Sequence, residues 1–222
     1  MENERNAGGP VKILRTGGVG EIIEKKSRFI ATLCPVNTEE EAVSFIERTK
    51  KKYWDARHNC SAFVIGDRAE LTRCSDDGEP PHTAGRPMLD ILLKEEVRNV
   101  CVVVTRYFGG VLLGTGGLVR AYQDAVKAGL AASETAEKRT AVPVTVTTDY
   151  TAFGKLSAYI SREALPVLRT DYGEGVTQVL LVPPEGLAAF SEQLSEASFG
   201  QAELTKGDPV SFLSVGSSIE FP

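Results

Sequence analysis

The segment "NVCVVVTRYF" (Asn99–Phe108) constrains the fold more than any other part of the chain. Its positions from Val100 to Val104 are apolar without interruption, and four of the five are valine, a β-branched residue that favours strands. A strand without polar alternation is typically buried on both faces. The sequence therefore predicts a sheet in which this segment is a central strand.

Strand and helix patterns surround this segment. Glu21–Val36 is rich in β-forming residues, and Phe29, Ala31 and Leu33 alternate along it, which predicts a strand with one buried face. "NCSAFVIGD" and "AELTRCSDD" are typical of a β-hairpin.

Three helices are predicted between these strands and after them. Thr38 with Glu41 forms a capping box, and the residues that follow at helical spacing are Val43, Ile46, Thr49/Lys50 and Tyr53. "RPMLDILLKEEV" predicts a second helix with Pro87 near its first turn. "GGLVRAYQDAVKAGLAAS" predicts a third, whose core stripe is Leu118, Tyr122, Ala125/Val126 and Gly129.

A domain boundary is expected within "SETAEKRTAVP". We predict an N-terminal domain at 1–137, ordered from about residue 17, and a C-terminal domain at 140–222. The second domain has the order βαββαβ, with the turn "DYGEG" between its second and third strands. This order is that of a ferredoxin-like domain, an antiparallel sheet with two helices on one face, so the fold class is α+β. The expected elements are strands at 142–149, 167–172, 177–182 and 201–205 and helices at 152–162 and 187–197.

Charge divides unevenly along the 222 residues, whose net charge is −5. Residues 1–139 carry 21 Lys+Arg and 20 Asp+Glu, which gives +1, whereas residues 140–222 carry 4 and 10, which gives −6. Phosphates are repelled by the second part, so a nucleic-acid surface is expected only in the first. Neither part is basic enough to predict DNA binding.

The compartment is predicted from what the chain lacks. The start, "MENERNAGGP", has no apolar signal segment and is expected to be a frayed tail. The longest run without charge, Tyr107–Val119, has 13 residues and five glycines, which is too short to span a bilayer. The four cysteines have no zinc-site spacing and are typical of reduced thiols. We therefore expect a cytoplasmic protein without a membrane partner.

Two segments are unusually dense in acids, glycines and arginine: "SDDGEPPHTAG" (75–85) and "TRYFGGVLLGTGGLVRAY" (105–122). In the first, Asp76, Asp77 and Glu79 surround a glycine turn. Grouped carboxylates suit magnesium or general-base chemistry, whereas Asp-Asp-Gly is commonly a solvated turn. Both interpretations stay open, and no metal site is assigned.

The second segment has features that suit an anion. Gly114, Gly116 and Gly117 precede a helix, where backbone N–H groups can bind phosphate or carboxylate, although the glycines also suit a plain tight turn. The spacing is neither GxGxxG nor a P-loop. Arg106 ends the apolar strand and can bind an anion or pair internally with Asp76 or Asp77.

The two histidines offer less. His58 is one turn after Asp55 and could be oriented as a general base, with Cys60, Ser61 or Thr83 as candidate nucleophiles. No nucleophile elbow is present, and most lone histidines are structural. "RTKKKY" (48–53) makes one helix end basic, which is usually a solvated feature and could extend an RNA-facing surface.

Four segments together resemble the IMPACT/YigZ family: "SRFIA", "DARHNCSAFVIG", "SDDGEPPHTAGRPML" and "VVVTRYFGGVLLGTGGLVRAY". The resemblance covers about 17–132, and residues 140–209 resemble the small C-terminal domain of the bacterial members. It implies an N-terminal βαβ domain similar to domain IV of elongation factor G and to GHMP kinases. It implies a C-terminal domain similar to domain V of elongation factor G.

The resemblance also implies a setting. Eukaryotic members regulate translational initiation through protein contacts, and nucleic-acid binding has been suggested for bacterial members from their fold. One departure is His82, where the family usually has glycine. Histidine there either narrows the loop as a ligand cradle or adds a side chain to it.

Three hypotheses follow. The first is a translation-associated regulator whose N-terminal cleft binds RNA or a ribosome-associated partner, with Tyr107 stacking on a base. The second is an enzyme, a hydrolase or transferase acting on a small phosphorylated or carboxylated substrate, with magnesium as an option and the cofactor otherwise unknown. The third is a purely structural cleft, in which Arg106 is buried against Asp76 and Asp77 and function resides in a protein-binding face. The predicted ligand-binding residues are Asp55, His58, Asp76, Asp77, Glu79, Thr83, Arg106, Tyr107, Gly114, Gly116 and Gly117.

Overall fold

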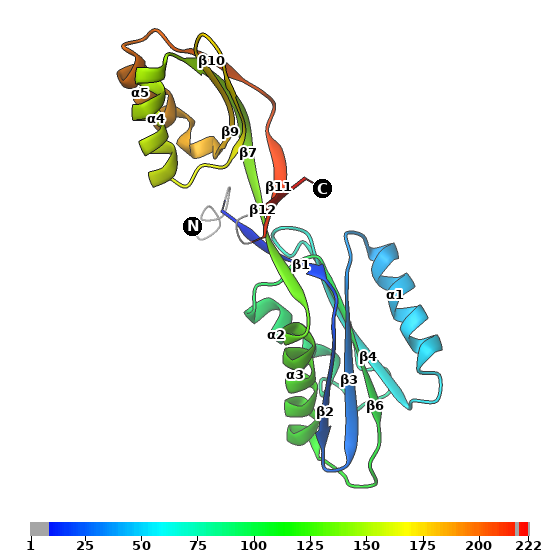
Figure 1. Ribbon diagram of the computed structural model, residues 1–222. Coiled ribbons are helices and arrows are strands. Elements are labelled where there is room, and N and C mark those ends of the chain that lie inside the picture. The colour runs from blue at the N-terminus through cyan, green and yellow to red at the C-terminus, as the bar shows by residue number, and fades with distance from the viewer. Residues whose placement is uncertain (1–8, 216–217, 222) are drawn as a thin grey trace, which may run out of the picture. The chain divides into compact units, whose positions relative to one another are not determined.

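The computed structural model describes residues 9–215 and 218–221. It has a mixed α+β architecture in two compact units, which divide between Glu137 and Lys138. Figure 1 shows the elements of each unit in chain order. The expected frayed tail at 1–10 lies almost entirely outside the described residues.

The first unit is built on a five-stranded sheet with the order β2-β3-β6-β4-β5. All neighbouring strands are antiparallel. The middle strand β6 (Val100–Tyr107) is buried from its first residue to Arg106, which confirms the predicted central strand. The other strands are β2 (Val19–Glu24), β3 (Ser27–Pro35), β4 (His58–Ile65) and β5 (Leu71–Ser75).

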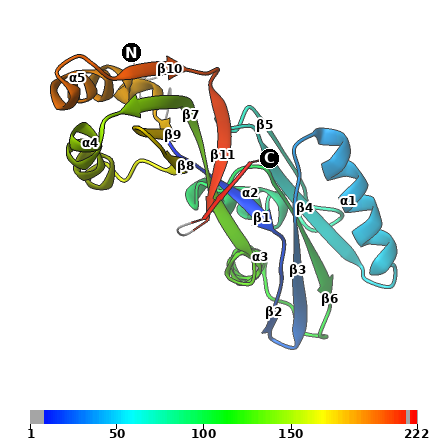
Figure 2. The same ribbon diagram turned by 45° about the horizontal axis from the view of Figure 1, so that its top comes forward.

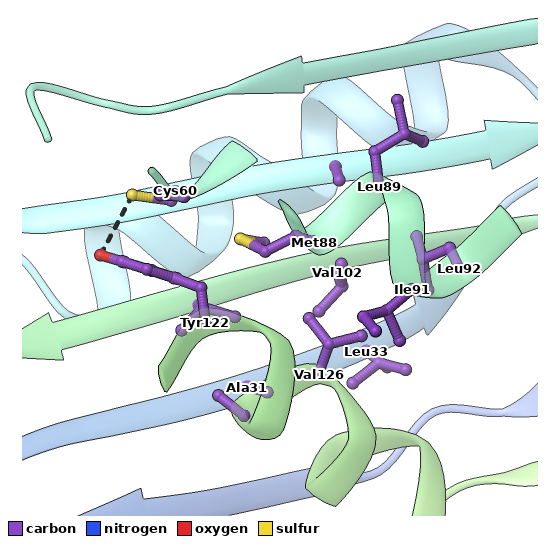
Figure 3. Packing of buried hydrophobic residues seen from close by; sticks show 14 of the residues in the cluster. Ala31, Leu33, Cys60, Met88, Leu89, Ile91, Leu92, Val102, Tyr122 and Val126 are labelled. Atoms are coloured by element: carbon purple, nitrogen blue, oxygen red, sulfur yellow. Dashed lines mark hydrogen bonds between the residues drawn. The ribbon is translucent and has the colours of Figure 1, made fainter. Parts of the chain in front are cut away.

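Helices cover both faces of this sheet (Figure 2). α1 (Glu39–Lys52) packs on one face, and α2 (Gly85–Lys94) and α3 (Thr115–Ala131) pack on the other. Figure 3 shows the second interface, where Met88 of α2 and Val126 of α3 lie over Val102 of the sheet.

The predicted helix features are confirmed with one exception. Thr38 caps α1 by accepting a hydrogen bond from the Glu41 amide, and every residue of the α3 stripe is buried. The predicted face of α1 was wrong at Val43, which is 49% exposed, and it missed the buried Ala42 and Phe45, whereas Thr49 is buried as expected. The buried stripe is therefore rotated by one residue from the expected one.

Two expectations at the start of the first unit were also wrong. A strand, β1 (Val11–Thr16), precedes the expected start near residue 17, because Leu14 is buried in the core and its amide bonds to the Arg98 carbonyl. The single strand expected at 21–36 is a hairpin, in which Lys25 and Lys26 form a two-residue turn with φ of 45° and 66°.

The second unit has the predicted βαββαβ order. Its four strands form the antiparallel order β10-β7-β9-β8, which is the ferredoxin-like arrangement. α4 and α5 pack on one face over an apolar cluster that includes Phe190 and Leu180. The bounds are β7 (Glu134–Thr148), α4 (Tyr150–Arg162), β8 (Val167–Tyr172), β9 (Val176–Val182), α5 (Leu187–Ser198) and β10 (Glu203–Lys206).

Three features of the second half were not predicted. The segment "SETAEKRTAVP" is not a loop, because β7 runs through the division between the units. β11 (Val210–Val215) and β12 (Ser218–Glu220) extend the sheet beyond β7, and Phe212 is buried against Leu181 on the face opposite the helices. A 3-10 turn, η1 (Pro184–Gly186), precedes α5. Within the described chain, no helix has the length and apolar character needed to cross a membrane.

Candidate functional site

Several loops meet at the end of the first unit where β6 ends. The cross-strand register places His58 opposite Arg106 and Arg28 opposite Tyr107. Gly109 packs so closely on the backbone of Lys26 that a Cβ at this position would overlap the Lys26 carbonyl. The β2–β3 turn, the α1–β4 loop and the β6–α3 loop therefore share one end of the sheet, as Figure 1 shows.

Arg106 is held inside this end. Only 6% of the residue is exposed, and its Nη1 donates to Glu79 Oε1 at 2.6 Å. Its guanidinium lies over the rings of Phe29 and Phe108, and Tyr122 donates to the same Glu79 oxygen at 2.9 Å. The expected internal partners, Asp76 and Asp77, were wrong, because the loop presents Glu79 to the arginine instead.

Asp76 organises the start of α2. Its carboxylate accepts hydrogen bonds from the amides of His82, Ala84 and Gly85 at 2.8–3.0 Å. Burial acts to raise the pKa of Asp76, but these three amides outweigh it and the pKa lies below its ordinary value. The side chain is thus a remote cap for a helix whose own N-cap residue, Ala84, has no side-chain acceptor.

Asp77 is equally engaged. One of its oxygens lies 2.7 Å from Lys50 Nζ, and the other accepts from the Asn59 amide at 2.7 Å. The two aspartates therefore point to different partners, although they are adjacent in sequence. In the described part of the chain, no group of three or more His, Cys, Asp or Glu is arranged to hold a metal ion.

His58 also has a structural partner. Its Nδ1 lies 2.9 Å from the Asp77 carbonyl oxygen, and its Nε2 lies 4.0 Å from Glu79 Oε1. The expected pairing with Asp55 was wrong, because Asp55 accepts from the Tyr107 hydroxyl at 2.8 Å. His58 is therefore fixed by the loop that carries Asp76, Asp77 and Glu79, which we call the acidic loop.

The three candidate nucleophiles, Cys60, Ser61 and Thr83, are all buried. Cys60 donates to the Asp76 carbonyl at 2.9 Å and to the Tyr122 hydroxyl at 3.3 Å, the contact dashed in Figure 3. Burial raises the pKa of Cys60 to about 12, so its thiol stays protonated at neutral pH. Thr83 is buried and donates to the Pro80 carbonyl. We infer from these contacts that neither side chain is placed to attack a substrate.

The glycine turn faces solvent. Gly114 has φ of 73° at the start of α3, a left-handed conformation that favours glycine. A Cβ at Gly114 or Gly116 would meet open space, whereas one at Gly117 would lie 3.0 Å from the Leu113 side chain. His82 has φ of 63°, a left-handed conformation that favours glycine, and its side chain is exposed.

The sequence prediction missed the most exposed aromatic side chain at this end. Trp54, the one tryptophan of the chain, is 82% exposed in the α1–β4 loop. It follows the three basic residues that end α1 and precedes Asp55. Its position directly after "KKKY" could have indicated a surface site. A tryptophan, however, is normally expected to be largely buried. We use the term basic end for Lys25, Lys26, Lys50, Lys51, Lys52, Trp54, Arg57, Tyr107 and Phe108.

Comparisons with known proteins agree with this architecture. Residues 25–130 match the family described as Impact N-terminal domain, and residues 146–201 match the family described as Domain of unknown function (DUF1949). The chain is therefore a two-unit protein with an Impact N-terminal domain followed by a DUF1949 domain.

Whole-chain relatives give the family. IMPACT family member YvyE of Bacillus subtilis (strain 168) is 40% identical over 195 residues, which is 88% of this chain and 90% of that protein. IMPACT family member YigZ of Escherichia coli (strain K12) is 37% identical over 81% of this chain and 89% of that protein. A crystal structure of a hypothetical protein is 33% identical, covers 94% of this chain and 98% of its own, and has a TM-score of 0.57. The chain belongs to the IMPACT family.

Proposed function

We propose that this protein is a translation-associated regulator that binds single-stranded RNA through the basic end. The observation that carries the proposal is Trp54, which is 82% exposed beside the lysines that end α1. Base stacking on an aromatic ring and backbone contact by lysine are the two components of sequence-tolerant single-strand binding.

The aromatic side chains of the basic end are joined by contacts into one surface. Trp54 adjoins Asp55, which accepts from the hydroxyl of Tyr107. Tyr107 leads into Phe108, whose ring is 46% exposed, and then into Gly109, which packs on Lys26. A strand of RNA that stacks on Trp54 can therefore continue toward the turn at Lys26.

The turn formed by Lys25 and Lys26, which we call the lysine turn, supports the proposal because its two lysines lower the stability of the fold. Lys25 and Lys26 both have positive φ, the pattern of a type I′ turn that Asn-Gly occupies best. A left-handed residue other than glycine is disfavoured by roughly 1 kcal/mol. Both side chains are exposed, so two positive charges stand at a hairpin tip where folding alone would favour other residues.

The buried contacts give this surface a firm base. Arg106, Glu79 and Tyr122 tie β6, the acidic loop and α3 together below Phe108. Lys50 is held by Asp77, which leaves the last two lysines of α1 as the exposed charges. In this proposal the acids of the cleft position loops and do not face the RNA.

The same contacts weigh against the enzyme alternative. Asp76, Asp77 and Glu79 each bind groups of the chain itself. A magnesium-dependent hydrolase or transferase would need at least some of these carboxylates for the ion or the reacting group. The open glycine turn at Gly114–Gly117 remains as an auxiliary phosphate contact within the RNA proposal.

The setting in translation is carried over from the family resemblance. We also propose, on the same resemblance, that the two units share the folds of domains IV and V of elongation factor G. The four-stranded order of the second unit supports the latter assignment. A ribosome-associated protein as partner is the competing outcome of the experiment below.

The test uses the single tryptophan as a reporter. Titration with an oligouridine should quench Trp54 fluorescence, and binding should weaken steeply as salt rises, because each phosphate contact releases a counterion. Labelled oligouridine measures the variants by anisotropy. Lys51→Glu/Lys52→Glu should weaken binding at least about tenfold at low salt.

The matched control is Lys206→Glu, which changes an exposed lysine of β10 in the second unit. It should leave RNA affinity unchanged. Equal losses in both variants, or an affinity that does not respond to salt, would contradict the proposal. Binding to ribosomal proteins without RNA would favour the protein partner.

A further inference from the structure

The second unit carries an exposed group of aromatic side chains that its fold does not need. Tyr150 and Tyr172 are 54% and 67% exposed, and Phe153 is half-buried between α4 and β8. The rings of Phe153 and Tyr172 meet edge to face with centroids 6.0 Å apart. Tyr150 donates to the Gly173 carbonyl at 2.9 Å, which fixes the third ring beside the β8–β9 turn. We call Tyr150, Phe153 and Tyr172 the aromatic patch.

A glycine next to the patch is a second, independent observation. Gly154 lies inside α4, where a Cβ would meet nothing within 4 Å and φ is not left-handed. Glycine in a helix interior lowers stability by about 1 kcal/mol relative to alanine. Folding therefore gives no reason for glycine here. Its effect is to leave a position without a side chain on the exposed surface of α4, beside Phe153 and one turn from Tyr150. We call this position the notch.

The charge around the patch identifies the kind of partner. Asp149, Asp171 and Glu174 border it. Two basic residues lie nearby: Arg169, whose Nε is 2.7 Å from Asp171 Oδ2, and Lys155, which follows Gly154 and lies over the Phe199 ring. Residues 140–222 carry 10 acidic and 4 basic residues, so a phosphate backbone is repelled. Arginine suits such a surface, because its planar guanidinium stacks on tyrosine and pairs with carboxylates.

The neighbouring backbone favours an extended segment. β8 is the last strand of its sheet, so no further strand of the described residues pairs with its outer edge. Val167 and Leu168 of this strand are exposed. An extended peptide can add to such an edge by main-chain hydrogen bonds, while alternate side chains reach the surface beside it. The bulge between Val167 and Arg169 confines regular pairing to the half of β8 that ends at Tyr172.

We propose that the second unit binds an extended, arginine-containing peptide segment of a protein partner, with the aromatic patch and the β8 edge as its site. Guanidinium groups stack on Tyr150 and Tyr172, Asp171 and Glu174 pair with them, and the notch at Gly154 lets the segment approach the helix. This site is independent of the RNA surface of the first unit.

The test measures anisotropy of a fluorescein-labelled peptide of alternating arginine and valine with the full chain. Tyr172→Ala should weaken binding by about tenfold, because it removes an exposed cation–π partner without touching the core. Gly154→Leu should weaken it similarly, since helical side chains lean toward the N-terminus and the leucine would lie toward Tyr150. Ala189→Leu, which adds a leucine to an exposed position of α5, should bind like the wild type.

The outcomes separate the explanations. Loss of binding in both patch variants, with thermal unfolding at or above the wild-type temperature and no binding of the matching glutamate–valine peptide, supports the site. No binding to the arginine peptide, equal binding in all variants, or loss through Lys51→Glu/Lys52→Glu in the first unit overturns it. Displacement of the peptide by oligouridine would also overturn it.

Discussion

The two units differ in where they keep their charge. Among the described residues, the buried charged side chains are Glu79 and Arg106, and both belong to the first unit. The main core of the second unit consists of valine, leucine, isoleucine and phenylalanine. The exposed charges differ in sign. Lysines stand at the basic end of the first unit, whereas carboxylates surround the aromatic patch of the second.

This difference has a structural reason. The loops of the basic end are held in place by hydrogen bonds and by ion pairs, among them Arg106–Glu79 and Lys50–Asp77. The second unit has regular helices and strands around an apolar core, and its exposed aromatics are not needed to order a loop. Both units contain local features that lower stability, among them the lysine turn in the first and Gly154 in the second.

The largest expected effect comes from breaking the buried pair. Arg106→Met leaves the Glu79 carboxylate buried with the Tyr122 hydroxyl as its remaining close donor. Such an uncompensated charge costs about 3–5 kcal/mol in the free energy of unfolding. Hydrogen exchange resolved by segment should show faster exchange of β6 and α3, with β9 unchanged.

The control is an ion pair of the second unit. Arg162→Met removes an exposed pair with Glu163 and should change stability by less than about 1 kcal/mol. If Arg106→Met and Arg162→Met lowered the free energy of unfolding by similar amounts, a buried ion pair would not distinguish the first unit from the second. Recovery of stability in Arg106→Met/Glu79→Met would sharpen it.

A smaller effect is expected at the acidic loop. Asp76→Ala removes the acceptor of three amides and should cost about 2 kcal/mol, measured by urea unfolding. The pKa of Asp76 is lowered in the folded chain, so its contribution is complete above the unfolded pKa near 3.8 and is lost as pH falls through the folded value.

The pH dependence supplies its own control. Wild-type stability should therefore fall more steeply below about pH 4 than that of Asp76→Asn, which keeps an oxygen acceptor and has no titrating carboxyl. Parallel curves for the two proteins would show that Asp76 does not hold α2 as described.

Much of the fold was predictable because it rests on periodic patterns. The central strand, the α3 stripe and the order of the second unit were confirmed. The β2–β3 turn was missed because two lysines carry no turn signal, although the backbone there is left-handed. β11 was missed because its strand pattern is short and follows the last element of the expected plan.

The candidate site was less predictable because it depends on loop backbone. The sequence placed three acids near Arg106, but which of them reaches the guanidinium is set by the path of the chain through Asp77 and Gly78, both with positive φ. The exposure of Trp54 could not be predicted either, since it follows from the short α1–β4 loop and not from the residue's own preference.

The lysine turn provides a prediction in which stability and binding change in opposite directions. Lys25→Asn/Lys26→Gly should raise the free energy of unfolding by about 1 kcal/mol, because asparagine and glycine fit a type I′ turn. The same variant should bind oligouridine more weakly, with the salt slope reduced by about 1.4 for two lost phosphate contacts. A gain in stability with unchanged RNA affinity would remove the turn from the binding surface.

The smallest expected effect is the counterpart in the second unit. Gly154→Ala should raise stability by about 0.5–1 kcal/mol, since the methyl group enters open space and alanine favours the helix. Ala158→Gly, at an exposed position one turn along α4, should lower stability by the same amount, and hydrogen exchange of α4 measures both. A loss of stability in Gly154→Ala would mean that folding itself requires this glycine. In that case Gly154 would not point to a partner. The lysine turn alone would then be a feature that lowers stability without a role in folding.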